Sequence, residues 1–396
     1  MKARGAIAFG AALIALFCAG LWLGGHPGKL PSSLRDPFVA EPVSLASEAT
    51  EAIRDNYYRP VGEEELGNAS LQGMVRELRR RNEDRFSEYF SEEALEHFNQ
   101  ALSGRFTGIG LSVTEVKRGL RAVQVFRDSP AEAAGIEVGE TIVSVEGDSI
   151  AGVSSEAATA KIKGPEGTEV TVGVLDPKSG EVRELRLTRA EVALPIVSRK
   201  LVEVGRRKLG YVRLLAFSEG AHALLGQAVR KVTGEGAEGI VLDLRGNGGG
   251  LLQEAVLAAS VFLPEGEVVV TTDSRTQGHA EYRTVGGNLP PLPTVVLVDR
   301  STASAAEILA AALADQAGAE VVGTRSFGKG VFQQEIELAN GGALKLTIGE
   351  YFTPDGTNLA ESRGIHPDVR IADDPATAVD EARQRALGVL ASQVGR

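Results

Sequence analysis

The sequence has very little cysteine: one residue, Cys18, in a chain of 396. Cys18 lies in the apolar N-terminal segment, so the rest of the chain has no thiol. This excludes disulfide bonds and cysteine-ligated metals from everything beyond that segment. A body without thiols suits an oxidising and a reducing compartment equally.

The sequence also lacks basic runs. The formal net charge is −11, and no Lys/Arg-rich stretch with interleaved aromatic residues is present. A protein that binds nucleic acid non-specifically needs a basic face to neutralise phosphates, so we predict no nucleic-acid partner. The apolar and charged fractions, 43% and 24%, are ordinary for a globular protein. The length gives room for about two or three domains, each with its own core.

Charge is absent from residues 6–25, AIAFGAALIALFCAGLWLGG, which follow Lys2 and Arg4. This segment is about as long as a helix that crosses a bilayer. Basic residues before it favour a cytoplasmic N-terminus and an exported body. A cleaved signal peptide is the alternative, but cleavage at the small residues would leave an apolar remnant. We favour an uncleaved anchor over residues 1–25, and both interpretations place the body on the extracytoplasmic side.

Proline and glycine divide the rest of the chain. The proline-rich residues 26–43 are predicted to form an extended linker, and residues 44–103 have apolar positions at helical spacing. Residues 104–190 carry short β-rich runs with helix-like pieces between them, which predicts a small, partly open barrel. Residues 191–372 alternate strand and helix patterns, as in a sheet covered by helices, and residues 373–396 end the chain as a helix.

Residues Gly323–Lys329 read G-x-x-x-x-G-K, which is most of a phosphate-binding loop. Such a loop needs Ser or Thr after the lysine to hold magnesium, and a helix that begins at the phosphates. Here Gly330 follows, and then VFQQEIEL, which is a strand pattern. Both requirements fail, so we reject a nucleotide site. A solvated loop lysine is then the simplest alternative for Lys329.

Ser304 raises a different possibility for that lysine. It lies in DRSTASAAEI, where a predicted strand at 294–298 gives way to a predicted helix from about Ala303. A serine at such a turn is exposed at a sheet edge, with its own amide and the next one free at the helix N-terminus. These amides and the helix dipole can stabilise an oxyanion. Taken alone, Ser304 is better explained as a helix N-cap.

A third segment, LDLRGNGGGLL at residues 242–252, has consecutive glycines between a predicted strand and a predicted helix. Glycines allow another chain to approach the backbone closely, and their spacing does not match G-x-G-x-x-G. The Ser304 hydroxyl, the Lys329 amine and these backbone amides together describe an acyl-transfer site.

No histidine has an acid in a recognisable motif, and no G-x-S-x-G elbow is present. The histidines are His26, His97, His222, His279 and His366. A Ser–Lys pair needs no histidine, but its lysine must be partly desolvated so that its pKa falls.

These segments resemble the C-terminal processing proteases, also called tail-specific proteases, a serine peptidase family with a Ser–Lys catalytic pair. The resemblance covers about residues 45–385. It implies a multidomain α+β fold: an N-terminal helical region, a PDZ domain over 104–190 and a crotonase/ClpP-like α/β protease core over 191–372. It also implies an exported serine endopeptidase that cleaves near the C-termini of proteins.

By this resemblance, Ser304 in STASAAEI is the nucleophile and Lys329 in GTRSFGKG is the general base. Gln333 in GKGVFQQ resembles the third member, which orients the lysine. The segment DLRGNGGG resembles the family's glycine segment, and its Gly250 would supply the oxyanion-hole amides together with Ala305.

The resemblance assigns tail recognition to the PDZ domain. FTGIGLSV would be its carboxylate-binding loop, where the amides of Gly108, Ile109, Gly110 and Leu111 capture a chain terminus while the peptide adds as a strand. Lys163 in KIKGPEGT stands where relatives carry a basic residue that links PDZ occupancy to the protease core.

The resemblance further implies protein or peptide C-terminal tails as partners, a homodimer through the helical region and the terminal helix, and no metal or organic cofactor. The membrane would be a partner through the N-terminal segment. A rival from another class is a PDZ scaffold on an inactive protease-like core, which the intact Ser304, Lys329 and Gln333 disfavour. An enoyl-hydratase-like enzyme is a weaker rival, because the PDZ segment and export do not fit it.

Overall fold

The structure is a computed structural model that describes residues 41–286, 291–374 and 376–394. The predicted anchor at 1–25 and most of the predicted linker at 26–43 lie outside these residues. Within the described ranges, no helix has both the length and the apolar character of a membrane span. The chain divides into two compact units, Met1–Ser91 and Glu92–Arg396.

The first unit contains α3 (Glu41–Asn56), α4 (Glu63–Asn82) and the short strand β1 (Glu88–Phe90). The prediction of helix throughout 44–103 is wrong over residues 83–91. There Glu83 adopts a left-handed conformation with φ 52°, and its amide donates to the Arg79 carbonyl. The Asp84 carboxylate then accepts from the Phe86 and Ser87 amides at 2.8 and 3.2 Å, and these bonds turn the chain out of the helix.

The second unit begins with α5 (Glu92–Ser103), which leads into the region of the predicted PDZ domain. Its strands form an antiparallel path in the order β3–β4–β5–β7–β8, with β6 paired to β5. Two short helices close a separate apolar core built around side chains such as Leu120, Ile142 and Val172. The elements are β3 (Leu111–Val116), β4 (Gly119–Val125), α6 (Pro130–Ala133), β5 (Thr141–Val145), β6 (Asp148–Ser149), α7 (Ser155–Ile162), β7 (Glu169–Leu175) and β8 (Val182–Thr188).

The main sheet of the second unit has the order β10–β11–β12–β15–β16–β19. Strand β10 is antiparallel to β11, and all other neighbours in this sheet are parallel. Every residue of β12 and β15 is buried, as expected for parallel strands covered on both faces. The strands are β10 (Val197–Val204), β11 (Arg207–Leu214), β12 (Ile240–Asp243), β15 (Thr294–Val298), β16 (Glu320–Gly323) and β19 (Val369–Arg370).

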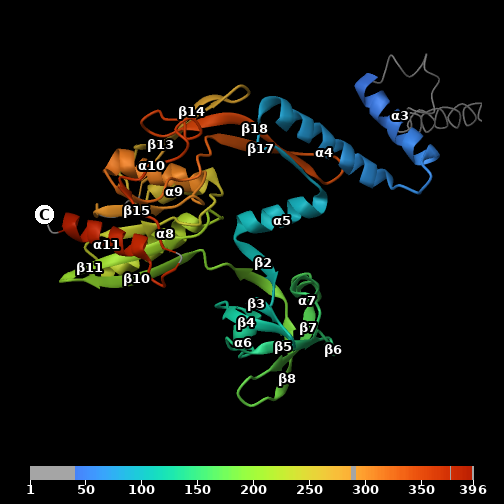
Figure 1. The fold of residues 1–396 in the computed structure, drawn as a ribbon, viewed down its shortest axis with the longest axis horizontal. Coiled ribbons are helices and arrows are strands. Elements are labelled where there is room, and N and C mark those ends of the chain that lie inside the picture. Colours follow the sequence, from blue (N-terminus) through green and yellow to red (C-terminus); the bar gives the residue numbers. More distant parts are fainter. Residues whose placement is uncertain (1–40, 287–290, 375, 395–396) are drawn as a thin grey trace, which may run out of the picture. The chain divides into compact units, whose positions relative to one another are not determined.

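Helices cover both faces of this sheet (Figure 1). One face packs against α8 (Ala221–Gly234), α9 (Leu252–Ala259) and α10 (Ala305–Ala317). The other face packs against the terminal helix α11 (Glu381–Val394). The alternation along β12 explains this arrangement, because Ile240 and Leu242 join the first core while Val241 joins the second.

A second, antiparallel set of strands runs β17–β18–β13–β14. The strands are β13 (Val268–Ser274), β14 (Gly278–Arg283), β17 (Val331–Glu337) and β18 (Ala343–Phe352). Adjacent parallel strands of the main sheet present their carboxyl ends at one edge. The loops that leave β12, β15 and β16 therefore meet there, and they carry the glycine segment, Ser304 and Lys329.

Candidate active site

Ser304 lies between β15 and α10, at the N-cap position of the helix, with φ 56° and ψ −122°. Positive φ is costly for a residue with a Cβ, and such strain is typical of a serine on a tight strand-to-helix turn. The prediction that its own amide is free is wrong, because the Ser304 N–H donates to Glu307 Oε2 at 2.9 Å. The next residue, Ala305, begins the helix and lines the same pocket as Ser304.

Glu307 connects this turn to the lysine loop, a role that no local sequence pattern predicted. Its side chain is fully buried, and it accepts the Gly328 amide at 2.7 Å and the Lys329 amide at 3.0 Å. It also accepts the Ser326 hydroxyl. Burial raises the pKa of Glu307, while these hydrogen bonds oppose the rise. The Glu307 carboxylate therefore holds the turn with Ser304 and the loop with Lys329 together.

Lys329 lies in the loop between β16 and β17. The element after it is a strand, whereas a phosphate-binding loop would be followed by a helix. Its Nζ donates to Gln333 Oε1 at 2.8 Å. Burial, and then the charge of Lys345, lower the pKa of Lys329 from 10.5 to about 8, while Glu307 acts in the opposite direction. A lowered pKa makes the neutral amine accessible near neutral pH, as a proton acceptor requires.

Gln333 follows a bulge in β17, where the register with β18 shifts between Phe332 and Gln333. Its Nε2 donates to Thr347 Oγ1 on β18 at 3.3 Å. This bond orients the amide so that its oxygen faces the Lys329 amine. A lysine held at one N–H has fewer orientations for its lone pair.

The glycine segment at 242–252 lies close to Ser304, as the absence of side chains at its glycines allows. A Cβ on Gly249, at φ 98°, would lie 2.9 Å from the Ser304 Cβ, and one on Gly250, at φ 141°, would lie 2.3 Å from the Phe217 carbonyl oxygen. Residues 217 and 250 form an isolated parallel bridge that uses the carbonyl of Gly249 and the amide of Leu251. The Gly250 amide takes no part in that bridge, and Gly250 lines the pocket.

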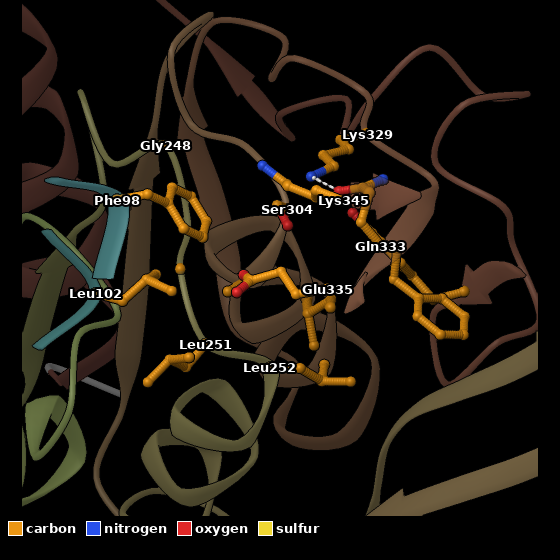
Figure 2. Close-up of a pocket in the computed structure, with 15 residues that line it drawn as sticks. Phe98, Leu102, Gly248, Leu251, Leu252, Ser304, Lys329, Gln333, Glu335 and Lys345 are labelled. Atoms are coloured by element: carbon orange, nitrogen blue, oxygen red, sulfur yellow. Dashed lines mark hydrogen bonds between the residues drawn. The ribbon is translucent and has the colours of Figure 1, made fainter. Parts of the chain in front are cut away.

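A cavity of about 380 Å³ is lined by all five residues that the resemblance assigns to catalysis: Ser304, Lys329, Gln333, Gly250 and Ala305. Figure 2 shows Ser304, Lys329 and Gln333 together there, with the bond between the last two. The structure adds lining residues to which no motif assigned a role. Several are neighbours of the motif residues: Gly248, Leu251, Leu252, Ile308, Phe332 and Glu335. The others come from distant parts of the chain: Phe98, Leu102, Lys345 and Tyr351. Among them, Lys345 Nζ lies 4.6 Å from the centre of the Phe98 ring.

Two of the histidines have carboxylate partners that the sequence did not reveal. His222 Nδ1 lies 2.8 Å from Glu254 Oε2, and His279 Nδ1 lies 2.8 Å from Asp273 Oδ1. None of these four residues lines the pocket that contains Ser304.

A second cavity, of about 60 Å³, contains the four residues assigned to tail binding, Gly108, Ile109, Gly110 and Leu111, and also Lys163, to which the resemblance assigns the coupling role. The Ile109 carbonyl accepts from the Ala131 amide at 2.8 Å, and the Gly110 carbonyl accepts from the Phe126 amide at 3.0 Å. Because a trans peptide points its N–H opposite to its C=O, the amides of Gly110 and Leu111 face away from those donors. Lys163 caps the end of α7 and is exposed.

Comparison with known proteins gives two family matches: Peptidase family S41 over residues 208–371 and PDZ domain over residues 98–175. The chain is 31% identical over 324 residues to the Carboxy-terminal processing protease CtpA of Bacillus subtilis, covering 82% of this chain and 68% of that protein. It is 34% identical over 366 residues to the Carboxyl-terminal-processing protease of Picosynechococcus sp., covering 90% and 82%.

The solved structure of a photosystem II D1 C-terminal processing protease is also similar, with a TM-score of 0.51 and 28% identity. The match covers 88% of this chain and 98% of that one. The chain spans about two thirds of the length of the Bacillus relatives, at 68% and 66%.

Proposed function

The chain belongs to peptidase family S41, the carboxy-terminal processing proteases, and is a serine-type peptidase with a PDZ domain; from this premise we propose that it cleaves proteins near their C-termini through an acyl-enzyme on Ser304. The observation that carries the proposal is that a strained serine and a partly buried lysine line one pocket. Acyl transfer needs that combination of hydroxyl and amine.

Lys329 is the general base in this proposal. With a pKa of about 8, roughly one tenth of the amine is neutral at pH 7. One N–H is held by the Gln333 oxygen, which leaves the nitrogen lone pair for the Ser304 hydroxyl. As Lys329 takes that proton, Oγ forms a bond to the carbonyl carbon of the scissile peptide.

The negative charge that develops on the carbonyl oxygen is stabilised by the amides of Gly250 and Ala305, which line the same pocket. The protonated Lys329 then gives its proton to the departing amine as the C–N bond breaks, leaving an ester on Ser304. In the second half, Lys329 takes a proton from water, whose oxygen attacks the ester carbon. The proton returns to Ser304 Oγ as the ester bond breaks.

The pocket lining supports an unfolded, apolar substrate. Its walls are largely aliphatic and aromatic, which suits an apolar side chain, and its volume of about 380 Å³ admits part of an extended chain but not a folded domain. The apolar lining residues are Phe98, Leu102, Leu251, Leu252, Ile308 and Phe332. The substrate's terminal carboxylate would bind the amides of the loop at 108–111, with the tail paired as an added strand.

The charge-free segment at 6–25 supports a location on the extracytoplasmic face of a membrane, with residues 1–25 as a single-pass anchor. The coupling role of Lys163 and the homodimer stay predictions.

The test compares the full-length chain with Ser304→Ala on an unfolded reporter that ends in an apolar tail. Ser301→Ala is the matched control, because Ser301 is an exposed serine of the same loop whose amide, rather than its hydroxyl, donates to Asp299. We expect cleavage by the wild type and by Ser301→Ala, and none by Ser304→Ala. Equal survival of the reporter with all three proteins would instead support the PDZ scaffold on an inactive core.

A further inference from the structure

Tyr351 on β18 is buried against the lysine loop. Its side chain is 2% exposed, and it lines the cavity that contains Ser304 and Lys329. The Tyr351 amide donates to the Gly330 carbonyl at 3.0 Å, and the Asn358 side chain donates to the Tyr351 carbonyl at 3.4 Å. The backbone that carries the ring is therefore fixed directly beside the lysine.

The Tyr351 hydroxyl is buried and has no hydrogen-bond partner among the residues that the structure describes. Ser304 and Glu307 are nevertheless close enough to affect the pKa of the phenol, and Ser304 lines the same pocket. No hydrogen bond of ordinary distance and angle joins the Ser304 side chain to the phenol in the resting enzyme.

Burial keeps the phenol protonated, since it raises the pKa of Tyr351 well above 10. The hydroxyl is therefore a neutral donor around neutral pH. Burying such a group without a partner costs free energy that phenylalanine would not cost. Costs of this kind are retained mainly where they serve function.

We propose that Tyr351 is a positioning residue for the reaction: its phenolic O–H donates to Ser304 Oγ and directs the serine proton toward Lys329. This inference rests on the proposed function. As Lys329 takes the proton, Oγ becomes more negative and the bond from the phenol strengthens. An interaction that is loose in the resting state and tight in the transition state raises kcat rather than substrate affinity.

The test is Tyr351→Phe, which keeps the ring and removes only the hydroxyl. Tyr282→Phe on β14 is the control, because Tyr282 also packs against the core but does not line the pocket. Turnover of fluorescein-labelled β-casein gives kcat and KM, labelling by diisopropyl fluorophosphate gives the reactivity of Ser304, and a thermal melt gives stability.

For Tyr351→Phe we expect kcat and the labelling rate to fall about 10- to 100-fold, with KM within about twofold of the wild type. The melting temperature should be unchanged or higher, because an unpartnered buried hydroxyl has been removed. A structural role cannot produce lower turnover together with undiminished stability.

Two results would overturn the inference: turnover by Tyr351→Phe equal to that of Tyr282→Phe, or lost turnover accompanied by a lower melting temperature. Both differ from failure of the proposed function. That failure would appear as equal action of the wild type and Ser304→Ala on β-casein, whether both cleave it or neither does, and whatever the tyrosine variant does.

Discussion

Lys329 has the surroundings of a base rather than those of a surface lysine. Its pKa is lowered to about 8 by burial first and by the charge of Lys345 second. Lys345 is itself in the pocket, over the Phe98 ring. The second lysine therefore affects the chemistry through its charge, without needing to touch the substrate.

We predict that Lys345→Met moves the rising limb of the pH–rate profile to higher pH. Only the neutral Lys329 accepts a proton, so the rate rises with pH through about 8 in the wild type. Removing the neighbouring positive charge removes one cause of the lowered pKa, and less amine is then neutral at pH 7. The measurement is kcat for β-casein as a function of pH.

Lys345→Arg is the control for that experiment, because it keeps the charge while changing the shape of the side chain. Its rising limb should stay near that of the wild type. If the methionine and arginine variants share one pH profile, the charge of Lys345 has no influence on the base.

At the residue scale, motifs predicted those residues of the site that have a recognisable pattern in the sequence around them. Ser304 and Lys329 could be found because a hydroxyl at a strand-to-helix turn and a lysine between glycines have local signatures. Tyr351 and Lys345 could not be found in this way. Both lie on one strand with an ordinary β pattern, and only the pairing of β17 with β18 brings them to the pocket.

At the scale of elements, one buried carboxylate fixes the distance between α10 and the loop before β17. Glu307 receives the amides of Ser304, Gly328 and Lys329. The capping position of Glu307 in its own helix is a local feature, but its bonds to the lysine loop depend on the order β15–β16 in the sheet. The sequence could therefore predict both elements but not the group that joins them.

We predict that Glu307→Gln lowers both stability and turnover. The glutamine nitrogen cannot accept, so at least one buried amide loses its partner, at a cost of about 1–3 kcal/mol. Displacement of the serine turn relative to the lysine should lower turnover about 10- to 100-fold. Urea unfolding and β-casein turnover measure the two effects.

Glu337→Gln is the matched control for this prediction, since Glu337 is exposed on β17 and does not line the pocket. It should leave both quantities near their wild-type values. Equal stability and turnover of the two glutamine variants would show that Glu307 does not hold the site together.

Strand and helix patterns predicted most elements because burial imposes a period on the sequence. The main failure was β1, in a segment whose apolar positions also fit a helix. There the deciding interactions were the left-handed Glu83 and the hydrogen bonds of Asp84. Such short-range backbone geometry leaves little trace in a hydrophobic pattern.

At the scale of the whole molecule, the chain carries a PDZ domain and a peptidase in one polypeptide. In the proposed function, a tail held by the PDZ domain raises the effective concentration of the adjoining substrate chain at the peptidase. Tail binding should therefore act on KM for substrates that have a tail, and it should leave kcat and the cleavage of tail-free peptides unchanged.

We predict that Gly110→Ala separates these two functions. Gly110 has φ 82°, and a Cβ there would lie 2.2 Å from the Ser129 Cβ, so the loop of the tail-binding cavity must move. KM for a reporter with an apolar C-terminal tail should rise about tenfold, while a short tail-free peptide should be cleaved as before. Gly180→Ala is the control, because Gly180 has a similar φ of 75° with nothing within 4 Å of the added Cβ. If Gly110→Ala slowed both substrates equally, the loop would support the catalytic core itself, and tail capture would not be its separate role.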